Sequence, residues 1–349
     1  MKADILTTWN IRCGIATYSS YLVESLKRVG VKVNVIKVEK PPSLNIIKFF
    51  KVVRKIHQDR IVHVQYQPGL FIPLAAFPPL NYLPLLILYF KYKKINRTVL
   101  TIHEIFYDTW LDRQLLKVMA RFLNQVEVLI VHNPSLKELL STRGVDEDKI
   151  VVLPHGTPPP ELMDKGMAKD QLGLSGKRVL TIFGFVHKNK GHDLVLEVLP
   201  NLDPDVVLLV AGGPQVKQHR HYYRHLQRQA QELGVEDRVR FCGFVEDKNL
   251  PLVFNATDLA IFPYRWIITS GSFHQALSYQ IPTLTSDLDY FQEIQSRYGC
   301  VELFHSGDKG DLEARIKDVL SQLDKQQYLQ SRCQDFYAQT NWETVALET

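Results

Sequence analysis

Short apolar runs alternate with amphipathic stretches along the chain, and the pattern occurs in two successive series. The first series of apolar runs comprises Val33–Val38, Ile61–Gln65, Thr98–Ile102, Val128–Val131 and Val151–Leu153. The second comprises Arg178–Phe183, Val206–Ala211, Val239–Cys242, Leu259–Phe262 and Thr283–Ser286. Apolar strands that alternate with helices indicate a parallel sheet covered on both faces. The sequence therefore predicts an α/β fold with two doubly wound, Rossmann-like domains facing a central cleft.

The length of 349 residues also fits two domains, because a single hydrophobic core rarely grows that large. Gly156, Thr157 and the prolines at 158–160 separate the two series. We predict one domain at residues 1–165, a second at 166–328 and a terminal segment at 329–349. In sheets of this kind ligands bind beyond the carboxyl ends of the strands, so the loops that follow strands are the candidate sites.

Composition and charge exclude several classes of protein. The four cysteines, Cys13, Cys242, Cys300 and Cys333, form no Cys-x-x-Cys pair, which disfavours a zinc knuckle, a redox motif or a disulfide framework and favours a reducing cytoplasm. The amino terminus lacks the apolar core of a signal peptide. The formal charge of +5 is spread among acidic residues, so we expect no nucleic-acid partner.

The longest apolar stretch, Leu80–Tyr92, is interrupted by Asn81 and Pro84 and is too short to span a bilayer. Two interpretations remain open. The stretch forms a buried helix of the first domain, or it forms a helix whose basic rim, with Lys91, Lys93 and Lys94, touches lipid. The second interpretation predicts peripheral contact with the inner face of a membrane.

Two loops of the first domain carry candidate functional residues. Gly14 follows the opening strand and precedes an amphipathic helix, where a glycine lets backbone amides approach a phosphate. A tight turn that needs glycine for steric reasons alone is the alternative. His103 follows the strand Thr98–Ile102 and is placed to donate a hydrogen bond to a sugar or phosphate, although a lone histidine can equally be structural.

Two loops of the second domain point to a diphosphate. The segment Phe183–Gly191 contains Gly184, His187, Lys188 and Lys190, and Lys190 stands just before a helix start, where it can offer its charge to phosphate oxygens. The alternative is a solvated, lysine-rich turn. The second loop places hydroxyls and a glycine ahead of another helix; its candidate residues are Arg265, Thr269, Ser270, Gly271, Ser272, Phe273 and Gln275. We predict that a pyrophosphate binds where these two loops meet, and that Gln275 hydrogen-bonds a ribose or faces water.

In this order the motifs resemble the GT-B glycosyltransferases, specifically the retaining enzymes of family 4, over nearly the full chain. Cys13–Tyr18 resembles their amino-terminal glycine loop, and His103 resembles the histidine near the transferred sugar. Leu153–Gly156 resembles the interdomain turn, and Phe183–Gly191 the loop that ends in Lys-Gly. The remaining matches are the glycine turn Ala211–Pro214 with Gly213, the segment Arg240–Val245 with Phe244 and Val245 beside the nucleotide base, and the terminal helix Tyr328–Leu347, which would cross back onto the first domain.

Two departures from the family pattern concern the donor pocket. Phe185 replaces the arginine that usually follows the loop glycine, and Ile267 and Gln275 replace an acidic pair. The resemblance then implies that Thr269, Ser270 and Gln275 hold the donor, with Arg265 or Lys188 supplying positive charge.

The resemblance implies a retaining hexosyl transfer from a nucleoside-diphosphate sugar to a lipid-linked glycan, polysaccharide or small molecule, with His103 and Lys190 as catalytic residues. The second domain would bind the donor and the first the acceptor. No metal or other cofactor is expected, because fixed cations and helix-start amides can stabilise the departing diphosphate. The alternatives are a catalytically weak or inactive nucleotide-sugar-binding subunit and a sugar-nucleotide epimerase.

Overall fold

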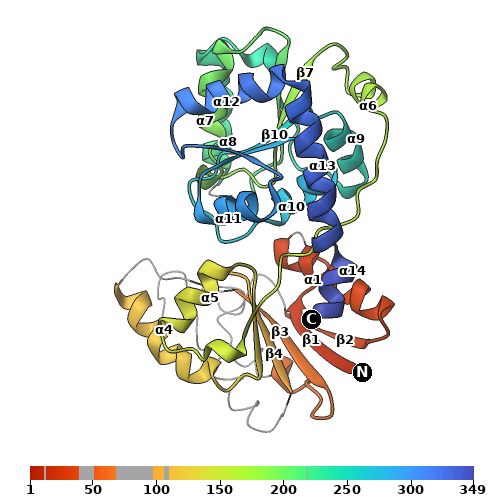
Figure 1. Ribbon diagram of the computed structural model, residues 1–349, viewed down its shortest axis with the longest axis vertical. Helices are drawn as coiled ribbons and strands as arrows, with labels where there is room; N and C mark the ends of the chain where they lie inside the picture. Colours follow the sequence, from red (N-terminus) through yellow and green to blue (C-terminus); the bar gives the residue numbers. More distant parts are fainter. Residues whose placement is uncertain (12, 39–50, 68–96, 106–109, 218) are drawn as a thin grey trace. The chain divides into compact units, whose positions relative to one another are not determined.

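The computed structural model describes residues 1–11, 13–38, 51–67, 97–105, 110–217 and 219–349. These residues form two compact units, the first made of Met1–Gly156 with Trp342–Thr349 and the second of Thr157–Asn341. Each unit contains one six-stranded sheet in which all paired strands are parallel (Figure 1). The predicted α/β class with two Rossmann-like domains is therefore confirmed.

The first unit contains the strand order β2-β1-β3-β4-β5-β6. Its strands are β1 (Lys2–Thr8), β2 (Lys32–Val38), β3 (Ile61–Tyr66), β4 (Thr98–Ile102), β5 (Val128–Val131) and β6 (Ile150–Val152). Its helices include α1 (Gly14–Arg28), α4 (Trp110–Leu123), α5 (Pro134–Ser141) and α14 (Trp342–Glu348). α1 packs against α14, with Tyr18, Leu22 and Trp342 in one apolar cluster on the sheet. The last helix of the chain is thus part of the first core.

The second unit contains the strand order β12-β11-β10-β7-β8-β9. Its strands are β7 (Arg178–Phe183), β8 (Val206–Ala211), β9 (Val239–Phe241), β10 (Leu259–Phe262), β11 (Thr283–Ser286) and β12 (Glu302–Phe304). Its helices are α6 (Lys165–Gln171), α7 (His192–Val198), α8 (His219–Glu232), α9 (Leu250–Asn255), α10 (Gly271–Ser278), α11 (Asp289–Tyr298), α12 (Lys309–Ser321) and α13 (Leu323–Thr340). One core cluster unites α7, α8 and α12, and another unites α9, α10, α11 and α13, so both faces of the sheet are covered.

The ten predicted strands are all present, most of them with the predicted limits. The prediction missed β12, whose three residues are too few to stand out from the following helix. The segment Tyr328–Leu347 was expected to be a terminal helix that crosses back onto the first domain. The structure divides it between α13 and α14, of which α14 belongs to the first unit. Asn341 adopts an extended conformation (φ −61°, ψ 157°) that ends α13 before α14 begins.

The predicted limits at 165 and 328 fall inside α6 and α13, whereas the compact units divide after Gly156 and after Asn341. α13 belongs wholly to the second unit because Leu329, Cys333 and Phe336 are buried in its core.

Two chain segments, around residues 157 and 340, lie side by side where the second unit begins and ends. The Thr157 amide donates to the Thr340 carbonyl at 2.8 Å, and the two hydroxyls lie 2.7 Å apart. The Thr157 hydroxyl also lies 3.0 Å from Nδ1 of His274, which belongs to α10. Both ends of this unit are therefore tied to each other and to the helix at its predicted ligand site.

The stretch Leu80–Lys94, for which membrane contact was predicted, lies outside the described residues. Among the helices that are described, none is long and apolar enough to cross a membrane.

Candidate active site

Four loops at the carboxyl ends of β7, β8, β9 and β10 meet in the second unit, and they contain the predicted donor residues. The Val186 amide donates to the Gly213 carbonyl at 2.9 Å, which joins the loop after β7 to the loop after β8. A Cβ on Gly213 would lie 3.2 Å from the Phe244 amide nitrogen, in the loop after β9. The amide nitrogen of Arg265, after β10, donates to the Asn189 carbonyl at 2.9 Å. The two loops that were predicted to form the pyrophosphate site are thus in direct contact.

Glycine is required at the points of closest approach. Gly184 has a φ of +115°, and a Cβ there would lie 3.1 Å from Oγ of Ser272. Gly191 has a φ of +66°, and its Cβ would lie 1.9 Å from the Pro263 carbonyl oxygen. A Cβ on Gly212 would come within 1.8 Å of the Gly184 carbonyl oxygen. Side chains at these positions would push the loops apart.

Lys190 lies above the aromatic ring of Tyr264, with Nζ 3.5 Å from the ring centroid. A cation over an aromatic face is held in place without losing its charge. The Tyr264 hydroxyl lies 3.3 Å from the hydroxyls of both Ser270 and Ser272, which lie 2.9 Å from each other. One ammonium group and three hydroxyls therefore gather beside the start of α10.

The start of α10 offers backbone amides to an anion. Ser270 caps the helix, because its hydroxyl accepts from the Phe273 amide at 3.3 Å. Gly271 is exposed and Ser272 is half-buried at the first positions of the helix. The free amides and the positive end of the helix dipole favour a negatively charged group at this point.

Arg265 is engaged by an acidic residue. Its guanidinium makes two hydrogen bonds to the Asp193 carboxylate, at 3.0 and 2.7 Å, and a third to the Lys188 carbonyl at 2.6 Å. Burial works against the charge of Asp193, but the hydrogen bonds from Arg265 and Tyr222 outweigh burial and lower its pKa. Arg265 thus fastens the loop after β10 to α7. Lys188 and Lys190 of this loop cluster form no ion pair with any residue that the structure describes.

His187 and His192 flank the lysine loop as neutral groups. Burial lowers the pKa of His187 to about 4, and the charge of Lys190 adds to the effect. Burial also lowers the pKa of His192, the first residue of α7, to about 3. A neutral imidazole donates one hydrogen bond from one ring nitrogen and accepts one at the other without adding charge to the site.

The other predicted donor residues border the same loops. Phe244 is exposed after β9, with Val245 half-buried beside it. Thr269 and Gln275 are half-buried on either side of the α10 start. Ile267, at the position of a family acid, packs against the core cluster that holds Tyr264.

The candidates in the first unit, Gly14 and His103, lie at the carboxyl edge of the other sheet. Gly14 opens α1, and no described atom lies within 4 Å of the place its Cβ would take. Its φ is not positive, so the steric alternative has no support among the described residues.

His103 follows β4 and belongs to a buried aromatic cluster around Tyr18. The Tyr18 ring centroid lies 4.5 Å from His103, 5.4 Å from His132, 5.1 Å from His155 and 4.7 Å from Trp342. The three histidines follow the neighbouring strands β4, β5 and β6. Burial lowers the pKa of His103 well below its usual value, and the neighbouring histidines lower it further. His103 is therefore neutral in the physiological range.

A polar chain along β3 and β4 holds the His103 ring. Nε2 of His103 lies 2.8 Å from Oε1 of Gln65, and Nε2 of Gln65 lies 3.1 Å from Nε2 of His63. That His63 nitrogen lies 2.7 Å from Oγ1 of Thr101. All four side chains are buried, so this chain of polar contacts fixes the orientation of the His103 ring.

Sequence reasoning missed Tyr18, Gln65, His132, His155 and Tyr264. For His132 and His155 a signal was available, because each of the three successive strands β4, β5 and β6 is followed by a histidine. Nothing in the sequence linked Tyr264 to Lys190, because that contact depends on how two loops approach each other.

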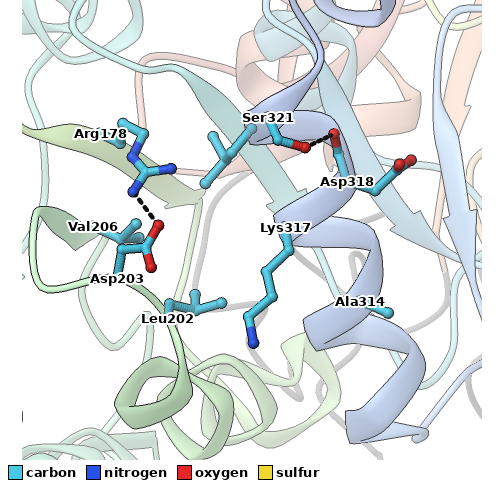
Figure 2. A pocket seen from close by; sticks show the side chains of 9 residues that line it. Arg178, Leu202, Asp203, Val206, Ala314, Lys317, Asp318 and Ser321 are labelled. Carbon is cyan, nitrogen blue, oxygen red and sulfur yellow. Dashed lines mark hydrogen bonds and ion pairs between the residues drawn. The ribbon is translucent and has the colours of Figure 1, made fainter.

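No group of three or more His, Cys, Asp or Glu side chains that could hold a metal ion occurs among the residues with described positions. The surface pocket shown in Figure 2, about 450 Å³ in volume, is lined by Arg178, Leu202, Val206 and Lys317 among others. Arg178 and Val206 are the first residues of β7 and β8, so this pocket lies at the opposite edge of the sheet from the loop cluster. An ion pair of 2.6 Å between Arg178 and Asp203 spans part of its wall.

Comparison with known families gives two matches that follow one another along the chain. The model described as glycosyl transferases group 1 matches residues 164–335, and the model described as glycosyltransferase family 4 matches residues 13–159.

Among curated proteins, a mannosylfructose-phosphate synthase of Agrobacterium fabrum is 28% identical over 171 residues, which are 46% of this chain and 37% of that protein. The lipopolysaccharide core biosynthesis mannosyltransferase LpsB of Rhizobium meliloti is 32% identical over 138 residues, 38% of each chain. These matches span less than half the length of the curated relatives.

Among solved structures, Anabaena HepE in complex with UDP superposes with a TM-score of 0.80 at 18% identity, covering 100% of this chain and 98% of that one. A sucrose-phosphate synthase of Thermosynechococcus elongatus superposes with a TM-score of 0.79 at 17% identity, covering 99% and 96%. At this level of identity the structures establish a shared fold, the two-domain GT-B architecture.

Proposed function

Because the chain belongs to the glycosyltransferases that these two family models describe, we propose that it transfers a sugar from a nucleoside-diphosphate sugar to a hydroxyl acceptor, with retention and without a metal ion. The convergence of the four loops around Lys190 and the start of α10 is the observation that carries this proposal. Backbone amides, one fixed ammonium group and a set of hydroxyls are the groups that suit a diphosphate.

The departing diphosphate gains negative charge in the transition state, and Lys190 and the amides of Gly271 and Ser272 are placed to meet it. The bond between the anomeric carbon and the phosphate oxygen breaks while a bond to the acceptor oxygen forms. The acceptor proton leaves with the diphosphate, so no charge is left on the product. Because Lys190 is already held against Tyr264, little reorganisation is needed as the charge develops.

We assign His103 to the transferred sugar, as a neutral hydrogen-bonding group. Its low pKa prevents it from becoming a cation beside an oxocarbenium-like sugar, where a positive charge would be repelled. The acceptor class we infer is a lipid-linked glycan, a polysaccharide or a small molecule; the names of the relatives include a lipopolysaccharide core, a diacylglycerol glycolipid and D-inositol 3-phosphate. A cytoplasmic site of action accords with the four free cysteines.

A nucleotide-sugar-binding subunit without efficient turnover is the second candidate. Ile267 is packed into the core and Gln275 is uncharged, so the position of the acidic pair offers no carboxylate. Binding of a donor without sugar transfer or slow donor hydrolysis would favour this candidate.

The test is a panel of UDP-, GDP- and ADP-sugars, screened for thermal stabilisation and for donor hydrolysis. With the donor that binds, Lys190→Ala should lower turnover at least tenfold, a barrier change of about 1.4 kcal/mol. Lys309→Ala, at an exposed position on α12, is the matched control and should keep its activity. Unchanged kinetics of Lys190→Ala would remove this lysine from the mechanism.

Metal independence has a separate test. Transfer should persist in excess EDTA, because Lys190 and the α10 amides take the place of a divalent cation beside the diphosphate. Loss of activity in EDTA that manganese restores would contradict this part of the proposal.

A further inference from the structure

The outer face of α8 carries a line of basic side chains. Arg220, Arg224 and Arg228 recur every fourth residue and are exposed, and His221 and His225 lie beside them on the same face. Successive arginines are therefore about 6 Å apart along the helix axis. We call these five residues the α8 stripe; the helix is labelled in Figure 1.

The arginines of the α8 stripe make no ion pair with any residue whose position is described. On other helices of the same unit the cations are neutralised at close range. Arg315 pairs with Asp311 and Lys317 with Glu313, both on α12, and Arg332 pairs with Asp335 on α13. These basic residues of α12 and α13 thus have acidic partners, whereas the arginines of α8 have none among the residues that the structure describes.

Acidic residues of the adjacent helix α7 are occupied elsewhere. The Asp193 carboxylate accepts hydrogen bonds from Arg265 and Tyr222, and Glu197 pairs with Lys309 at 2.7 Å. No acidic residue occurs in the sequence between Asp205 and Glu232. The stripe is therefore a local concentration of positive charge.

This concentration stands out because the unit as a whole is acidic. Residues 157–341 contain 20 Lys and Arg against 23 Asp and Glu, a formal net charge of −3. The net charge of this unit would repel a negatively charged partner. A partner that binds it must recognise the stripe itself.

We propose that the α8 stripe docks this protein on an anionic lipid surface. A single exposed helix presents a convex ridge, which suits an extended, flat array of headgroup charges. The exposed Val216 and Lys217 stand one turn ahead of Arg220 and extend the ridge with an apolar side chain and another cation. Nucleic acid is less suited, because no Phe, Tyr or Trp side chain is exposed on the stripe for base stacking.

The stripe begins beside the candidate donor site. The ring of His219, the first residue of α8, lies 5.3 Å from the ring of His187 in the lysine loop. Docking through α8 would therefore hold the loops after β7 and β8 close to the headgroup layer. The proposal concerns a surface, and it stands or falls independently of the transfer reaction.

The experiment is co-flotation of the full chain with phosphatidylcholine vesicles, with and without phosphatidylglycerol, at low and physiological salt. The stripe variant is Arg220→Gln with Arg224→Gln and Arg228→Gln. Each arginine near an anionic surface contributes about 1 kcal/mol, so the partition coefficient should fall on the order of 100-fold. Exposed helix positions accept glutamine readily, and circular dichroism checks that the fold is kept.

The matched control removes the same three charges from α12, with Lys309→Gln, Arg315→Gln and Lys317→Gln. This variant should still float with the anionic vesicles. The proposal is overturned if the wild type does not bind them, if both variants lose binding equally, or if the stripe variant binds as well as the wild type. The last result would point to another surface. Equally tight, stripe-dependent binding of a duplex oligonucleotide at the same salt would overturn the assignment to lipid.

Discussion

Replacing Gly191 with alanine should separate the two loops that form the candidate donor site. The new Cβ would lie 1.9 Å from the Pro263 carbonyl oxygen, whereas an ordinary contact begins near 3.4 Å, so the backbone must open by about 1.5 Å. Three hydrogen bonds across the same junction would be strained or lost. They join Arg265 to the carbonyls of Asn189 and Lys188, and the side-chain amide of Asn189 to the Trp266 carbonyl.

The size of the effect follows from two contributions. Alanine at a φ of +66° costs about 1–2 kcal/mol whatever its surroundings. Each of the three hydrogen bonds adds about 1 kcal/mol if it is lost. We therefore expect Gly191→Ala to destabilise the second unit by about 3–5 kcal/mol and to weaken donor binding at least tenfold.

Gly234 provides a control with the same backbone conformation. Its φ is +65°, and nothing lies within 4 Å of the place its Cβ would take. Gly234→Ala should therefore show the conformational term of about 1–2 kcal/mol alone and keep its donor affinity. Urea unfolding, followed by hydrogen exchange of the β7 and β10 amides, measures stability, and donor-induced thermal stabilisation measures binding. If the two variants behave alike, the close approach of Gly191 to Pro263 does not organise the site.

Two further predictions concern the first unit. Gln65→Met should lower turnover severalfold with little change in donor KM, because it removes the 2.8 Å contact that orients the His103 ring. Steady-state kinetics measures both quantities. Normal turnover would show that the ring is oriented without Gln65. Burial lowers the pKa of His63 and of His132 to about 4, so the unfolded chain takes up protons first as the pH falls. Stability that is complete above pH ~6.5 should then fall by about 2 kcal/mol per histidine by pH ~5. Urea unfolding checks this, and His132→Gln should reduce the loss by about 2 kcal/mol, the contribution of one histidine; a flat pH profile would contradict the low pKa values.

The sequence was most informative about features that depend on a single segment, such as the limits of one strand or the position of the loop that follows it. The continuous apolar runs at Val206–Ala211 and Leu259–Phe262 became central strands with the predicted limits, because strands buried on both faces must be apolar throughout. The order of the loops after these strands then followed from parallel topology. The donor residues could be proposed for the same reason, although their roles stay predictions.

The sequence was least informative where contacts join distant segments. Arg265 was proposed, as an alternative to Lys188, to supply positive charge to the donor, and it pairs with Asp193 on α7. The cluster around Tyr18 unites α1, three strand ends and Trp342 near the end of the chain. Such contacts depend on tertiary approach, and no local pattern of hydrophobicity or charge encodes them.

The pairing of Thr157 with Thr340 makes the second unit an insertion whose two ends are neighbours. Gly156 in turn is adjacent to Trp342, because a Cβ on this glycine would fall 2.3 Å from the indole ring. Each half of the molecule could therefore be produced as an independent fragment: residues 157–341 as they stand, and the remainder closed by a short linker across the excision point. Nucleotide binding and lipid binding by the α8 stripe could then both be measured on residues 157–341, with the remainder as the comparison fragment.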